Sequence, residues 1–232
     1  MRALLGLLAA TAMAVAATPA ARAEAPALSL AAVQGEAAAG DAEAMASLGW
    51  MYETGKGVTA DGAQAAKLYR AAADKGDAFG QWRMGVMIDE GKLAGSSDQA
   101  LLLFRKAAAQ KSPGAMASLG VMHATGRGVA RDYEAAMRYY QAAARMGSAH
   151  GLEGIGVLYA NGQGVERNMP EALAHWLVAA SAGDEDAMAL LMRFMPASGS
   201  PEAAPIYARA STIAAIYNVG ADDGAQTADR RN

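Results

Sequence analysis

Residues 40–75 read GDAEAMASLGWMYETGKGVTADGAQAAKLYRAAADK, and related versions of this stretch occupy residues 76–110, 111–146 and 147–182. A glycine near the middle of each copy marks the period. These glycines are Gly49, Gly85, Gly120 and Gly156, which are separated by 36, 35 and 36 residues. Regular self-similarity of this length is typical of solenoid proteins, in which each unit packs only against its neighbours.

The first copy predicts two antiparallel helices joined by a glycine turn. Ala44, Leu48 and Tyr52 recur at intervals of four residues, so they share one face of a helix that follows the cap residue Asp41. We call this first helix of each copy helix A. The Gly-Lys-Gly sequence at residues 55–57 ends it, because glycine adopts positive φ angles at little cost.

The second helix of each copy, helix B, follows Asp61 in the first copy and runs to about residue 74. Its predicted buried face consists of Ala65, Leu68, Tyr69 and Ala72. Hydrophobic residues make up 53% of the chain but aromatic residues only 6%, and the excess is alanine, the best helix former. Runs of strand-favouring residues are absent from the sequence, so we expect an all-α fold.

The glycine in the middle of each helix A requires a structural reason, because glycine there costs roughly 1 kcal/mol relative to alanine. We expect these glycines to let a neighbouring helix approach closely. A bulky residue at Gly120 should therefore push the helices apart.

The repeated positions form a specific pattern. In the first copy they are Gly40, Asp41, Ala44, Leu48, Gly49, Tyr52, Gly55, Gly57, Val58, Asp61, Ala65, Tyr69 and Ala72. The third copy keeps Ala115, Leu119, Gly120, Gly126, Gly128, Val129, Asp132, Ala136, Tyr139 and Tyr140, and the fourth keeps Gly147, Gly156, Tyr159, Gly162, Gly164, Val165, Ala172 and Trp176. The second copy departs from the pattern, with Leu93 and Ala94 in place of Gly-Val.

This pattern resembles the Sel-1-like repeat, a subclass of the tetratricopeptide-like helical repeats, over about residues 40–195. The resemblance implies a right-handed α/α superhelical solenoid of about four to five helix–turn–helix repeats. It also implies that helix A of each repeat lines the concave face.

The segments outside the four copies are predicted to form the ends of the solenoid. Residues 24–39 look like a lone helix B that serves as an N-terminal capping helix. Residues 183–219 begin a partial fifth repeat and then supply a C-terminal capping helix that covers the exposed end. The polar residues 220–232 are predicted to be a disordered tail.

Residues 1–23 have the layout of a secretory signal peptide. A positive charge at Arg2 precedes an apolar run at residues 3–17, and a small-x-small motif ends at Ala23. The apolar run is short for a bilayer span, although an uncleaved anchor is the alternative. We expect cleavage after Ala23 and a periplasmic or secreted protein with no stable membrane insertion afterwards.

The sequence offers little for catalysis or cofactor binding. It has no cysteine, and its three histidines, His123, His150 and His175, form no ligand motif. The glycine-rich turns lack the other residues of phosphate-binding loops, and nucleophile motifs are absent from the sequence. We therefore predict no catalytic, cofactor-binding or metal-binding residues, and a protein that is not an enzyme.

The net charge of −3 includes no basic stripe, so nucleic acid is not the expected partner. Candidate contacts for a protein or peptide are helix A residues that differ between repeats. They are Trp50, Phe79, Trp82, Arg83, Asp89 and His150. Large apolar side chains at variable positions are typical of interface hot spots, but these three aromatic residues could equally belong to a locally different core.

The resemblance implies a protein-interaction module, because relatives in bacterial envelopes include scaffolds for export machinery and negative regulators of sensor kinases. We predict an adaptor or regulator that holds another envelope protein on the concave helix A face. The alternative is a cell-wall or β-lactam-binding protein with weak hydrolase activity. Some cysteine-rich relatives have that link, but this chain lacks their cysteines. A secreted effector that binds host proteins is a third possibility, which the sequence does not separate from the first.

Overall fold

The structure is a computed structural model that describes residues 29–219, and over that range it contains α-helices and no strand. The helices are α2 (Leu30–Ala38), α3 (Ala42–Thr54), α4 (Gly62–Asp74), α5 (Ala78–Asp89), α6 (Ser97–Ala109), α7 (Pro113–Thr125), α8 (Tyr133–Arg145), α9 (Ala149–Asn161), α10 (Met169–Ser181), α11 (Glu185–Phe194) and α12 (Ala203–Ile216). The predicted all-α repeat fold is confirmed. The predicted signal peptide, the first residues of the N-terminal cap and the predicted tail lie outside the described residues.

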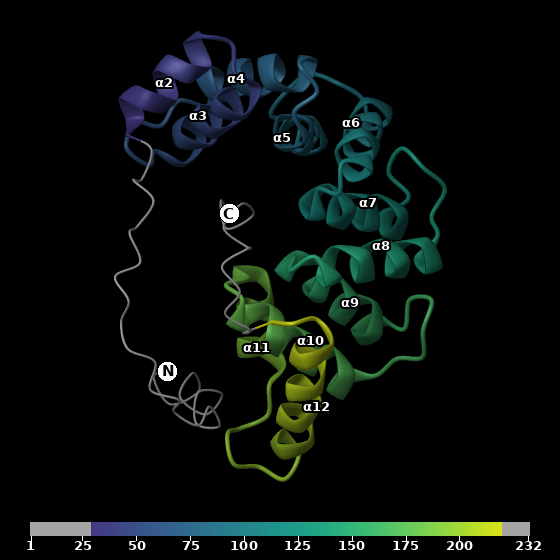
Figure 1. Cartoon of the computed structure of the whole chain (residues 1–232). Coiled ribbons are helices and arrows are strands. Elements are labelled where there is room, and N and C mark those ends of the chain that lie inside the picture. The colour runs from purple at the N-terminus through teal and green to yellow at the C-terminus, as the bar shows by residue number, and fades with distance from the viewer. Residues whose placement is uncertain (1–28, 220–232) are drawn as a thin grey trace.

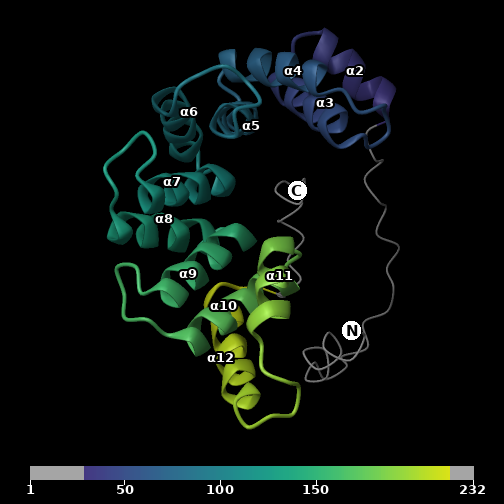
Figure 2. The ribbon, with the colours of Figure 1, turned by 180° about the vertical axis from the view of Figure 1, so that it is seen from behind.

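The helices follow one another along a curved arc, with α2 at one end and α11 and α12 at the other (Figure 1, Figure 2). They pack in sequential pairs, α3 with α4, α5 with α6, α7 with α8 and α9 with α10, and each pair is one repeat. The helix A of one repeat also contacts the helix A of the next, as α3 does α5, α5 does α7 and α7 does α9. In Figure 1, α3, α5 and α11 lie on the inner side of the arc.

Polar caps and glycines mark the ends of the helices. Asp41 Oδ1 accepts a hydrogen bond from the backbone N of Ala44 at 2.7 Å, which satisfies an N–H group that has no partner within the helix. Three of the helices A end at a glycine in the left-handed region: Gly55, Gly126 and Gly162. Helix α5 ends instead at Glu90 in a right-handed conformation, where the second repeat departs from the sequence pattern.

Each helix A glycine packs against an aromatic side chain of its own helix B. The pairs are Gly49 with Tyr69, Gly85 with Phe104, Gly120 with Tyr140 and Gly156 with Trp176. All four rings are buried. A Cβ atom at Gly120 would lie 2.5 Å from Cε1 of Tyr140, which is too close for a real carbon contact. The glycines therefore allow the close helix approach that the sequence predicts.

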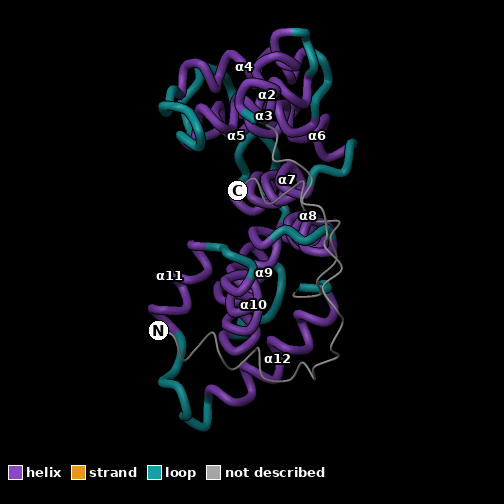
Figure 3. The backbone as a smooth tube through the Cα atoms, turned by 60° about the vertical axis from the view of Figure 1, so that its left-hand side comes forward, coloured by secondary structure: helices purple, strands orange, loops and turns teal. Residues whose placement is uncertain are grey.

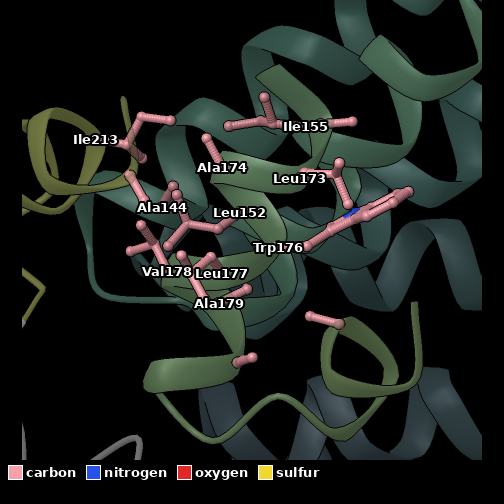
Figure 4. Close-up of a cluster of buried hydrophobic side chains, with 14 of the residues drawn as sticks. Ala144, Leu152, Ile155, Leu173, Ala174, Trp176, Leu177, Val178, Ala179 and Ile213 are labelled. Atoms are coloured by element: carbon pink, nitrogen blue, oxygen red, sulfur yellow. The ribbon is translucent and has the colours of Figure 1, made fainter. Parts of the chain in front are cut away.

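The largest core cluster of the described residues joins α8, α9, α10, α11 and α12. Figure 4 shows Trp176, Leu173 and Ile155 together, with Ile213 of α12 at another side of the cluster. Helix α10 is buried along most of its length, because it packs against α9, α11 and α12. None of the helices within residues 29–219 has both the length and the apolar character that a bilayer crossing requires.

The two ends of the solenoid differ. At the start, α2 packs against α3 with Val33 and Ala37 buried. At the other end, α11 takes the helix A place of a fifth repeat, but α12 packs mainly against α10 rather than beside α11. Figure 3 shows α10 between α11 and α12. The last helix thus covers α10, the final helix of the fourth repeat, rather than α11.

Candidate protein-binding surface

One stripe of each helix A faces away from the helix B of its own repeat, although Phe79 and Gly154 in this stripe contact the helix B of the preceding repeat. Positions spaced by four, three and four residues lie on one side of a helix, and in α3 they are Glu43, Ser47, Trp50 and Thr54. Gly49, which contacts helix B, lies on another side. The equivalent residues are Phe79, Arg83, Val86 and Glu90 in the second repeat, Gly114, Ser118, Val121 and Thr125 in the third, and His150, Gly154, Val157 and Asn161 in the fourth. We call this set the concave face.

An apolar row crosses the concave face at the third position of each stripe. Trp50, Val86, Val121 and Val157 occupy this position, and each is half-buried. Lys56 Nζ lies 4.4 Å from the centroid of the Trp50 ring, a cation–π distance. Sequence reasoning selected Trp50 for its size and missed the valines, although the repeat period places all four in register. Each of the four side chains packs partly against a core cluster and leaves part of its apolar surface exposed. Partly exposed apolar side chains that recur at one position of each repeat are suited to a protein partner.

Arg83 belongs to a network that joins the first two repeats. Arg83 Nε donates to Glu53 Oε2 at 3.1 Å, Arg83 Nη2 pairs with Glu53 Oε1, and the Tyr69 hydroxyl donates to Glu53 Oε2 at 2.7 Å. Burial opposes the charge of Arg83, but the hydrogen bonds and charge of Glu53 outweigh it and raise the pKa of Arg83. Burial and the Glu53 hydrogen bond raise the pKa of Tyr69. The side chains of Arg83 and Glu53 are only 17% and 19% exposed, and they pair with each other. The pair therefore holds α5 against α3.

Trp82 is a core residue rather than an exposed hot spot. It is 7% exposed, and its indole Nε1 donates to Ser118 Oγ of the next repeat at 3.0 Å. A Cβ atom at Gly114 would lie 2.6 Å from the Trp82 ring, so the indole depends on that glycine. Phe79 is half-buried and meets Trp82 edge-on, with 5.5 Å between the ring centroids. Of the two sequence interpretations, the locally different core applies to Trp82.

Asp89 and His150 have different surroundings. Asp89 Oδ2 lies 3.0 Å from Arg127 Nη2 in the turn after α7, so it links the second repeat to the third, as Glu53 links the first to the second. His150 is 60% exposed on the concave face, and its Nδ1 lies 3.1 Å from Asp184 Oδ2. The structure thus places Trp50, Phe79, Arg83 and His150 on one face, and it places Trp82 and Asp89 in contacts between repeats.

Glu153 lies beside acidic residues at the start of α11. Burial, together with the charges of Asp184 and Asp186, raises the pKa of Glu153 to about 7. Asp184 Oδ1 caps α11 by accepting a hydrogen bond from Ala187 N at 2.8 Å, whereas Asp184 Oδ2 is buried and accepts none. His150 comes within ion-pair distance of this oxygen, but outside hydrogen-bond geometry. Sequence reasoning missed Glu153.

A sequence signal for Glu153 exists in the repeat alignment. The equivalent positions carry Ala46, Trp82 and Ala117, all of them buried. A carboxyl group at a position that is otherwise apolar is the feature that identifies it.

The other two histidines stack on tyrosines between helix A and helix B. His123 of α7 stacks on Tyr139 of α8, and His175 of α10 stacks on Tyr159 of α9, so the two residue types exchange places between the third and fourth repeats. Burial lowers the pKa of both His123 and His175, which favours neutral rings. Among residues 29–219, no group of three His, Cys, Asp or Glu side chains is placed to hold a metal ion.

A family model for the Sel1 repeat matches residues 42–77, 78–112, 113–148 and 149–184. Each match begins two residues after the repeat start that the sequence pattern suggests. No curated protein matches the chain.

Several solved structures are similar to this chain. A Sel1 repeat protein from Oxalobacter formigenes is 31% identical, with a TM-score of 0.60 and 78% of each chain covered. A protective antigen present in uropathogenic Escherichia coli strains, which displays an SLR fold, is 29% identical with a TM-score of 0.57, and the match covers 78% of this chain and 40% of that one. An immunity protein from Pseudomonas aeruginosa is 25% identical with a TM-score of 0.54, and the match covers 95% of this chain and 82% of that one. With four matched repeats in this helical arc, the chain belongs to the Sel1 repeat family.

Proposed function

We propose that this protein is a scaffold that binds a segment of another protein along its concave face. Sel1 repeat proteins are generally protein-interaction scaffolds and are typically not enzymes. The observation that carries the proposal is the apolar row of Trp50, Val86, Val121 and Val157, which continues through four repeats. Extended concave faces are the usual binding surfaces of solenoids, and side chains spaced along an extended segment can meet such a row.

The ion pairs between neighbouring repeats favour a preformed surface. The Arg83–Glu53 pair and the Arg127–Asp89 pair each connect one repeat to the next. Contacts that fix neighbouring repeats reduce the ordering that binding would otherwise require. Arg83 and Asp89 therefore act by holding the repeats in place, while the apolar row meets the partner.

The partner that we propose is another protein of the bacterial envelope, with this chain as an adaptor or regulator. Two of the similar structures are immunity proteins from Pseudomonas aeruginosa, which supports a protein as the partner. The envelope location rests on the signal-peptide pattern of residues 1–23. Mass spectrometry of the protein from a periplasmic fraction should find a mature N-terminus at Glu24, and an intact Met1 there would contradict the location.

Site-specific photocrosslinking tests the binding face. A benzophenone amino acid at Val121 on the concave face should crosslink a partner in cells, whereas the same group at Leu102, which is exposed on the helix B α6, should not. The identified partner should then bind a Trp50→Ser/Val157→Ser variant at least about tenfold more weakly, and a Leu102→Ser variant equally well. Equal crosslinking from both positions, or unchanged affinity in the double variant, would show that another surface binds.

A cell-wall or β-lactam function makes a different prediction. The purified protein should neither hydrolyse nitrocefin nor bind muropeptides if it is a scaffold. Turnover that a single substitution abolishes would replace the scaffold proposal with an enzymatic one.

A further inference from the structure

The fifth repeat is only half built. Helix α11 aligns with α9 one period earlier, with Ala187 matching Gly151 and Leu191 matching Ile155. In the first four repeats, helix A is covered by the helix B that follows it in the chain. Helix α12 follows α11, but it packs mainly against α10, so within residues 29–219 no helix takes the helix B place beside α11.

The side of α11 that would meet a helix B is apolar and exposed. Met192 occupies the position of the packing glycine and is 79% exposed, whereas Gly120 and Gly156 are buried. One turn earlier, Met188 is 41% exposed, although its equivalent Leu152 is fully buried. Met188 and Met192 therefore expose apolar side chains on the side of α11 where the other repeats meet their own helix B.

Helix α12 leaves unused the face by which a helix B meets helix A. In α10 that face includes Trp176, which packs on Gly156 of α9. The positions one period later in α12 are Ala208, Thr212 and Ala215, all of them exposed. Helix α12 buries Ile206 and Ile213 against the core cluster around α10 instead.

We propose that α11 is the docking site for a helix of another protein, which continues the helix A–helix B interface of the first four repeats. That interface defines the chemistry of the occupant. In the first repeat, helix B places Ala65, Tyr69 and Ala72 on its buried side, with the Tyr69 ring at the glycine of helix A. On α11 the Met192 side chain takes the space of this ring. The partner helix therefore carries small residues at positions i, i+4 and i+7, and packs against the adaptable methionines.

This site is separate from the apolar row of the concave face. The row lies at the Trp50 position of each repeat, which corresponds to Arg193 in α11, whereas Met188 and Met192 lie on the side of α11 that faces helix B in other repeats. An experiment that excludes binding at one of these two sites therefore does not exclude binding at the other.

Two helical peptides test the proposal on the full chain. Both peptides have the sequence of α4, residues 62–74 of this protein. In both, Ala63 is replaced by Glu, and a lactam joins this side chain to Lys67. Positions 63 and 67 are exposed in α4, and the lactam stabilises the helix. One peptide keeps Tyr69 and the other has Tyr69→Ala. Fluorescence anisotropy should show that the alanine peptide binds the wild-type protein about tenfold more tightly than the tyrosine peptide.

Substitutions at residue 192 then report on the contact itself. Met192→Gly restores the glycine of the other repeats. This variant should therefore bind the tyrosine peptide more tightly than the alanine peptide, the opposite of the wild type. Met192→Asp should weaken binding of both peptides, and Leu102→Asp, at another exposed apolar side chain, should leave binding unchanged. Circular dichroism should show that all the variants fold.

Three results would overturn the proposal. One is no binding of the alanine peptide at about 1 mM. Another is binding that Met192→Asp does not weaken. The third is a dimer in sedimentation equilibrium that Met192→Asp dissociates, because a second copy of the chain would then cover α11.

Discussion

At the residue scale, the helix A glycines are matched to side chains that differ widely in size. The facing residue is Tyr69, Phe104, Tyr140 or Trp176, yet the glycine is the same in all four repeats. The requirement is for the absence of a Cβ atom rather than for one particular ring. The energy of each helix pair therefore depends on a residue that lowers the intrinsic stability of its own helix.

Gly120→Leu should destabilise the protein by about 2 kcal/mol or more, because the new side chain overlaps the buried Tyr140 ring. Urea unfolding measures the change. Gly35→Ala is the matched control, since Gly35 lies within α2 with open space around it, and it should stabilise the protein by about 0.5–1 kcal/mol. Equal stability of Gly120→Leu and wild type would contradict the close-packing role.

Glu153→Gln should remove a pH dependence of stability. The pKa of Glu153 is raised to about 7 in the folded protein from an ordinary 4.5, by burial first and then by Asp184 and Asp186. The folded state therefore holds a proton that the unfolded chain releases above pH 4.5. The contribution of this proton to the free energy of unfolding is fully present below pH 4.5. It is lost as the pH rises through 7, which lowers the free energy of unfolding by up to about 3 kcal/mol.

The measurement is urea unfolding at pH 5 and pH 8. The wild type should lose stability relative to Glu153→Gln between these two pH values. Glu134→Gln, at an exposed position of α8, should follow the wild-type pH dependence. Parallel curves for Glu153→Gln and wild type would show that Glu153 ionises normally.

At the element scale, α12 is held against α10 by both apolar and charged contacts. Arg209 Nε and Nη2 each donate to a Glu171 oxygen at 2.7 Å, a bidentate pair across the two helices. The Arg209 hydrogen bonds also hold the pKa of Glu171 below its usual value, despite partial burial. The location of α12 thus follows from contacts with α10, in the absence of a complementary face on α11.

Arg209→Met should loosen α12 while leaving the earlier repeats unchanged. Solvent screens the pair because the Arg209 side chain is 44% exposed, so the expected loss is about 1 kcal/mol. Hydrogen exchange of α12 amides should become about fivefold faster. Arg138→Met removes an exposed ion pair with Glu134, at 4.0 Å within α8. It should leave the hydrogen exchange of α8 and α12 unchanged. Identical exchange of α12 in both variants would argue against the role of Arg209.

At the scale of the whole molecule, stability in a solenoid is set by the contacts between successive repeats. Trp82 contributes one of these contacts, since it packs over Gly114 and donates a hydrogen bond to Ser118 in the third repeat. The ion pairs of Glu53 and Asp89 connect the same region of the arc. Unfolding of the first three repeats should therefore be coupled through this cluster.

Trp82→Ala should cost about 3–5 kcal/mol and separate the unfolding of the first two repeats from the rest. Hydrogen exchange under increasing urea should then show two groups of amides, with the boundary between α6 and α7. Trp50→Ala, at a half-buried position, should cost less and keep a single transition. One cooperative transition in Trp82→Ala would show that Trp82 does not couple the repeats.

Helix caps and glycine turns were predictable because they depend on contacts within about one period of the chain. Gly55 ends α3 and Asp41 caps it through bonds to residues a few positions away. The exposure of His150 and the packing of His123 also followed from their places in the repeat. The valines of the apolar row could have been predicted in the same way, but only by comparing all the repeats at that position.

The sequence by itself determined the helices, their pairing and the curved array, because in a solenoid each residue meets partners at fixed offsets along the chain. Only the tertiary structure decided that Trp82 is buried, that Glu153 lies among carboxylates and that α12 packs on α10. These outcomes involve side chains that break the repeat pattern. Their environments depend on the volume and charge of neighbours in the next repeat, which the period of the sequence does not encode.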